Sequence, residues 1–147
     1  LEDYSFFIAA LLSGYEADFD KSKLEFAVYL LSVAKDKFYK NETWYLSDDG
    51  FEVKANLVDK YYTSALGKMI QNILKIASLK NSFKYEKLAI NTLDSISEKI
   101  AKYQDATPAS ARAFLMLNQK IITIKSSKIN LINSKKEIYK IKYPYII

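Results

Sequence analysis

The chain has 147 residues, of which half are apolar, so it is long enough for one domain and can fill a hydrophobic core. It contains no Cys and no His, which excludes disulfides, thiolate nucleophiles and cysteine zinc sites and removes the commonest general base. The net charge is +5, the longest apolar stretch is far too short to span a bilayer, and no leader-like segment opens the chain. We therefore expect a cytoplasmic protein with no metal, no cofactor and no membrane insertion.

Only three Gly and two Pro occur, a composition that favours long helices over a many-stranded fold. Asp3 is placed to cap a first helix, Gly14 weakens the end of this helix, and Asp18 and Asp20 stand where a turn and the next N-cap are expected. A second helix is expected over about Lys21–Tyr39, apolar nearly all round and therefore packed on more than one side. The apolar face of the first helix consists of Tyr4, Phe7, Ile8, Leu11, Leu12 and Tyr15.

The helical period breaks between Asn41 and Asp59. Trp44–Ser47 and Phe51–Val53 have the composition of short extended segments, and Asp48-Asp49-Gly50 between them is a turn sequence. We expect a β-hairpin inserted between helices.

Three more helices follow. The apolar spacing predicts helices over about Thr63–Leu79 and Ser82–Tyr103, and a shorter one that starts at Thr107-Pro108. Short polar links make successive helices antiparallel neighbours. The fold class is therefore mainly α, built from antiparallel helix pairs over residues 1–118.

Residues 119–147 differ from the rest of the chain in charge, because they contain seven lysines and only one acidic residue, Glu137. Lys120–Lys125 is rich in β-branched residues, and Glu137–Tyr143 alternates apolar and basic side chains. Both patterns are typical of strands, so we expect a small, Lys-rich C-terminal β element.

Several segments of the sequence resemble a known family. Leu1-Glu2-Asp3-Tyr4-Ser5-Phe6, Tyr15-Glu16-Ala17 and Phe19-Asp20 follow the family pattern L-D-D-Y-A-F, Y-E-A and F-D. Trp44–Ser47 is similar to its G-Y-F-x-T strand, while Thr63-Ser64-Ala65-Leu66 stands where Pro-Ser-Gly-Asn is expected. The family consists of thioredoxin-domain-containing proteins with a C-terminal six-hairpin-glycosidase-like (α/α) toroid, of the spermatogenesis-associated type.

The resemblance implies that the chain is roughly the C-terminal half of such an (α/α) toroid. On this interpretation it is a fragment of a longer protein, and its partners are an upstream thioredoxin-like domain and the first half of the toroid. A half toroid exposes apolar helix faces, so we also expect self-association.

Two functions are compatible with the resemblance. In the first, the toroid forms a carbohydrate-binding or carbohydrate-processing pocket, because paired carboxylates and aromatic rings suit sugar chemistry. No catalytic residue is assigned, and each candidate also has a structural interpretation as a cap, a turn or a core side chain. The candidate pocket-lining residues are Asp3, Tyr4, Trp44, Tyr45, Asp59 and Ser64.

In the second, the domain is a non-catalytic structural or protein-interaction module, with twelve Tyr and eight Phe as contact residues. Nucleic-acid binding by the Lys-rich tail is a weaker third interpretation. The tail has no Arg, the usual reader of bases, and lysines that protect exposed strand edges explain the pattern better.

Overall fold

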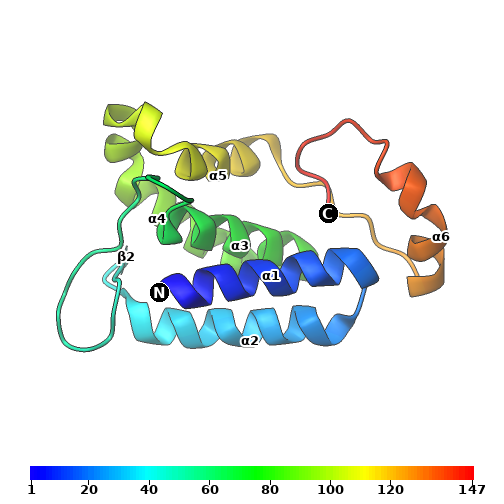
Figure 1. Cartoon of the computed structure of the whole chain (residues 1–147), viewed down its shortest axis with the longest axis horizontal. Coiled ribbons are helices and arrows are strands. Elements are labelled where there is room, and N and C mark those ends of the chain that lie inside the picture. The colour runs from blue at the N-terminus through cyan, green and yellow to red at the C-terminus, as the bar shows by residue number, and fades with distance from the viewer.

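The computed structural model describes residues 1–147 as a mainly helical molecule with six α-helices, one 3₁₀ helix and a two-stranded antiparallel sheet (Figure 1). Antiparallel helix pairs are confirmed, with α1 and α2 side by side and α3 returning through α4. The elements are α1 (Glu2–Asp18), α2 (Lys21–Phe38), β1 (Tyr39–Lys40), β2 (Thr43–Trp44), α3 (Ala65–Lys80), α4 (Phe83–Lys102), η1 (Gln104–Ala106), α5 (Pro108–Gln119) and α6 (Lys128–Ile138).

Local sequence signals explain most helix ends. Phe19 takes a left-handed conformation after α1, and the Asp20 carboxylate then accepts the Ser22 amide at 3.0 Å to begin α2. Asn81 is left-handed at the end of α3. The predicted cap at Asp3 is wrong, because α1 begins at Glu2 and its N-cap is Leu1. Asp3 lies in the first turn of α1, where the negative charge of a carboxylate interacts favourably with the helix dipole.

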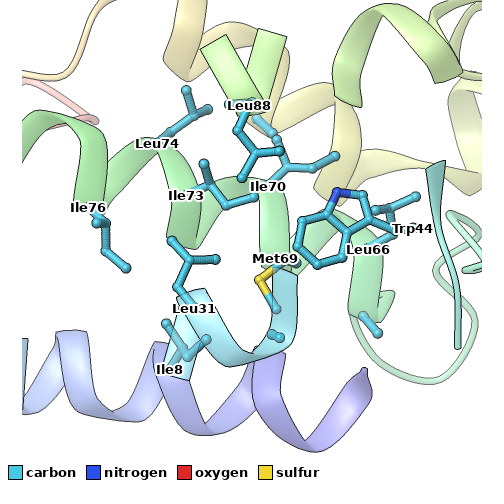
Figure 2. Packing of buried hydrophobic residues seen from close by; sticks show 14 of the residues in the cluster. Ile8, Leu31, Trp44, Leu66, Met69, Ile70, Ile73, Leu74, Ile76 and Leu88 are labelled. Carbon is cyan, nitrogen blue, oxygen red and sulfur yellow. The ribbon is translucent and has the colours of Figure 1, made fainter. Parts of the chain in front are cut away.

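The core is centred on α3. Ten of its sixteen residues are buried, and it packs against α1 on one side and against α4 and α5 on the other. Figure 2 shows Met69, Ile70 and Ile73 of α3 among Ile8 of α1, Leu31 of α2 and Leu88 of α4. α1, α3 and α5 are thus successive neighbours, while α2 and α4 each pack on the odd-numbered helix before them.

The predicted hairpin is present, and a second, tighter turn that was not predicted precedes it. β1 pairs with β2 around Asn41 and Glu42, both at positive φ, directly after α2 ends. Beyond β2, Tyr45 forms a single antiparallel bridge with Lys54, which closes a wide loop around the predicted Asp48–Gly50 turn. Within that loop Gly50 is at positive φ, the conformation that glycine adopts most readily, and the Leu46 amide donates to the Val53 carbonyl at 2.9 Å, so the two predicted extended segments do pair.

The C-terminal β element is smaller than predicted. Ile122 pairs in parallel with Ile146, and backbone bonds extend this pairing to Ile124 and Ile147. The predicted strand over Glu137–Tyr143 is wrong, since α6 occupies Lys128–Ile138. Ser127 caps α6 through the Asn130 amide at 3.3 Å. The alternation of apolar and basic side chains that suggested a strand therefore begins at Tyr139, directly after the end of α6.

None of the helices combines the length with the apolar character that crossing a membrane requires.

Candidate functional site

Asp59 lies in the linker before α3 and holds two helix N-termini together. Its Oδ1 accepts the Ser64 amide at 2.5 Å, and its Oδ2 accepts the Ala109 amide at 2.7 Å. Its own amide donates to the Ala106 carbonyl at 2.7 Å. Because the N-terminal amides of a helix lack partners within the helix, one carboxylate here satisfies amides of both α3 and α5.

Ser64 is the N-cap of α3 and is buried. Its hydroxyl accepts the Gly67 amide at 3.3 Å, as expected for a serine at this position. Asp59 and Ser64 are therefore the two predicted site residues that the structure joins by a hydrogen bond. Their polar atoms are directed at backbone amides.

Trp44 is a core residue. Its side chain is buried, its indole N–H donates to the Thr92 hydroxyl at 3.0 Å, and that hydroxyl donates to the Leu88 carbonyl at 2.8 Å. The indole also packs on the Tyr39 ring, with centroids 5.0 Å apart. Neighbouring Tyr45 is half-buried and takes part in the bridge that closes the wide loop.

Asp3 and Tyr4 lie on α1 with different surroundings. Asp3 is exposed, and Tyr4 packs edge-on against Phe38 of α2 with ring centroids 5.6 Å apart. Asp3 is therefore a surface residue, and Tyr4, like Trp44, is a packing residue.

The largest cleft in the molecule, of about 590 Å³, lies where α3, α4 and α5 meet and contains none of the predicted site residues. The join between α3 and α4 supplies Asn81, Ser82 and the exposed ring of Phe83, and Glu86 and Lys120 add opposite charges. The apolar lining comes from Leu74, Ala77, Met116, Leu117 and Ile121. In the sequence, Ser82 was named only as the start of a helix, although an aromatic residue beside several polar residues was a usable signal.

A strip of half-buried side chains runs along the one face of α3 that is not fully covered. We call Lys68, Gln71, Lys75 and Ser78 the α3 strip. Gln71 donates to the Ala109 carbonyl of α5 at 2.9 Å. Lys75 forms an ion pair with Glu16 of α1 at 2.5 Å. The strip therefore lies between α1 and α5.

The electrostatics of Lys68 are unusual. Partial burial lowers the pKa of its ammonium group from the ordinary lysine value, and the positive charges of Arg112 and Lys75 lower it further. The nearby Asp59 carboxylate acts in the opposite direction. This strip was not identified from the sequence, because the spacing of apolar residues was used there to find helices. That spacing does not show which residues lie near a lysine in the folded chain.

Three aromatic side chains form an exposed cluster on the hairpin of α1 and α2. The Phe7 ring lies edge-on to Phe26 with centroids 5.8 Å apart, and Phe26 stacks on Tyr29 at 6.2 Å. Between 43% and 61% of each residue is exposed to solvent. We call these three residues the α1–α2 aromatic patch; the sequence assigned Phe7 to the buried face of its helix.

Comparison with protein-family models, with curated proteins and with solved structures finds no match to this chain.

Proposed function

We propose that this chain is a structural and protein-interaction module, a segment of an (α/α) toroid like that of the thioredoxin-domain-containing family it resembles. The observation that carries the interaction function is the α1–α2 aromatic patch, in which three large rings touch one another at the surface. Aromatic residues that cluster on a surface are enriched at protein interfaces.

The roles of the predicted site residues support a module without a catalytic role. Both carboxylate oxygens of Asp59 accept backbone amides, the Ser64 hydroxyl caps α3, and the Trp44 indole is bonded inside the core. Each group thus already has a stabilising partner within the chain. A carboxylate engaged in this way is poorly suited to move a proton to or from a substrate.

The order of the helices supports the toroid. In such a ring, successive hairpins put alternate helices into an inner and an outer layer. The neighbour relations here follow part of that order, with α1, α3 and α5 successive neighbours and with α2 and α4 each packed on the odd-numbered helix before it.

The occupant proposed for the aromatic patch is another antiparallel helix pair. The patch lies on the exposed surface of the α1–α2 hairpin, which is the first hairpin of the helix series and contacts the next one through α1 and α3. Adding one further hairpin there continues the packing already seen between α1–α2 and α3–α4, and buries the three rings.

Self-association tests this proposal, because a second copy of the chain offers such a hairpin. We expect sedimentation velocity to show dimers that grow with concentration for the wild-type chain, and monomers for a variant combining Phe7→Ser, Phe26→Ser and Tyr29→Ser. A matched control carries Phe114→Ser and Leu115→Ser, which are similarly exposed on α5. Circular dichroism checks that both variants remain helical. A monomeric wild type, or equal effects of the two variants, contradicts the proposal.

Carbohydrate binding is the second candidate function, favoured by the cleft at α3, α4 and α5. There the exposed Phe83 ring can stack on a sugar face, and Asn81 and Glu86 can bond to hydroxyl groups. A thermal-shift screen with mono- and disaccharides tests it. The expected result is stabilisation that Phe83→Ala abolishes, and the absence of any stabilising sugar would exclude this candidate.

A further inference from the structure

Around Lys68 the chain places three cations, Lys68, Lys75 and Arg112, against two acids, Glu16 and Asp59, and this observation is independent of the function proposed above. Lys68 and Lys75 project from α3, and Arg112 acts on Lys68 from α5. The two acids nearby are already engaged, because Glu16 pairs with Lys75 and Asp59 binds two backbone amides. Neither Lys68 nor Arg112 forms an ion pair or a side-chain hydrogen bond.

A half-buried, unpaired lysine is costly to keep charged. Partial burial of Lys68 and the positive charges of Arg112 and Lys75 disfavour its charged form, and the Asp59 carboxylate favours it. Residues with such perturbed electrostatics gather at functional sites more often than elsewhere. A bound anion would remove this cost by supplying the missing negative charge.

The position of the two cations is fixed by the fold. Gln71, one turn along α3 from Lys68, bonds to the Ala109 carbonyl, and Arg112 is one turn along α5 from Ala109. Asp59 ties the N-termini of the same two helices together. Lys68 and Arg112 are therefore carried by helices whose relative position is set by three hydrogen bonds, so the helix backbones need not move when a ligand binds and only the exposed Arg112 side chain has to be ordered.

We infer that Lys68 and Arg112 form a binding site for the oxyanion group of a small ligand, with phosphate as the best match. The Arg112 guanidinium can donate two parallel hydrogen bonds to a phosphate or a carboxylate, and the Lys68 ammonium adds a point charge. Gln71 lies one turn from Lys68 on α3, and the second hydrogen of its side-chain amide is free to donate to the same group.

Titration with inorganic phosphate at low ionic strength, followed by two-dimensional NMR of the whole chain, tests the site. We expect saturable shifts at Lys68, Gln71 and Arg112, and binding weakened by about tenfold or more in Lys68→Gln and in Arg112→Gln, since each removes a charge-assisted hydrogen bond. Lys87→Gln, an exposed lysine on α4, is the matched control and should bind as the wild type does. A parallel titration with acetate separates a phosphate ligand from a carboxylate ligand.

Thermal unfolding distinguishes loss of binding from loss of fold. Lys68→Met keeps the apolar stem and removes the half-buried charge, so its melting temperature without phosphate should equal or exceed that of the wild type. Wild-type stability should rise with added phosphate, and that of Lys68→Met should not. The inference is overturned if neither anion gives saturable shifts, or if Lys87→Gln weakens binding as much as Lys68→Gln does.

Discussion

Asp59 shows how one side chain can determine the position of two helices. Removing its carboxylate leaves the Ser64 and Ala109 amides without acceptors at the starts of α3 and α5. We expect Asp59→Ala to lower the free energy of unfolding by about 2–3 kcal/mol, the range for lost charged hydrogen bonds and helix caps. Urea denaturation followed by circular dichroism measures this difference.

Asp94 provides the matched control. It is exposed on α4, and its carboxylate makes no hydrogen bond. Asp94→Ala should change stability by no more than about 0.5 kcal/mol, as is usual for surface positions. Equal stability of Asp59→Ala and the wild type would mean that water replaces the carboxylate, and the anchoring role of Asp59 would be wrong.

At the scale of elements, Gly67 sets the distance between α3 and α5. A Cβ atom there would lie 2.7 Å from the Ala109 Cβ and 3.1 Å from the Ser110 amide nitrogen. Alanine favours helices by about 1 kcal/mol over glycine, but forcing two backbones apart costs about 1–3 kcal/mol. We therefore expect Gly67→Ala to destabilise the protein in urea denaturation.

The comparison with Gly14 separates the two effects. A Cβ at Gly14 would meet the flexible Lys23 side chain at 3.2 Å, which can move aside at little cost. Gly14→Ala should thus stabilise the protein by up to about 1 kcal/mol through helix propensity alone. If both substitutions changed stability in the same direction, close packing at Gly67 would not be the controlling factor.

The helices with strong apolar patterns were predictable from sequence to within one or two residues. The spacing predicted Lys21–Tyr39 where α2 ends at Phe38, and Ser82–Tyr103 where α4 spans Phe83–Lys102. α6 was missed because Leu131 is its single buried residue and gives no periodic signal. Its surroundings come from distant parts of the chain, since Tyr15 and Leu79 line the same pocket as Leu131.

The candidate site was predictable only in part, for a related reason. The sequence identified Asp59 and Ser64 as chemically notable, and the structure joins them. It could not show that the second partner of Asp59 is the Ala109 amide, 50 residues away. The sequence alone does not distinguish an aspartate that binds a ligand from one that binds the amides of two helix ends. The positions of the cleft and of the α3 strip depend equally on such distant neighbours.

At the scale of the whole molecule, the C-terminal segment is attached more weakly than the helices around α3. α6 has 11 residues, a length at which an isolated helix is marginal in water, and it buries one side chain. The segment is further attached to the helices by a hydrogen bond from Lys135 to the Ala17 carbonyl, by one between the Ser78 and Thr123 hydroxyls, and by Ile121 and Tyr145, which pack against the core.

Hydrogen exchange measures this difference directly. The amides of α6 should exchange through local opening, and those of α3 only when the whole molecule unfolds. Leu131→Ala should speed exchange in α6 and leave α3 protected, because it removes the one buried contact of that helix. Leu93→Ala, in the central core, should speed exchange in both helices by lowering global stability, by about 2–5 kcal/mol. Equal protection of α3 and α6 in the wild type would instead mean that the C-terminal segment folds cooperatively with the core, since one unfolding event would then expose both sets of amides.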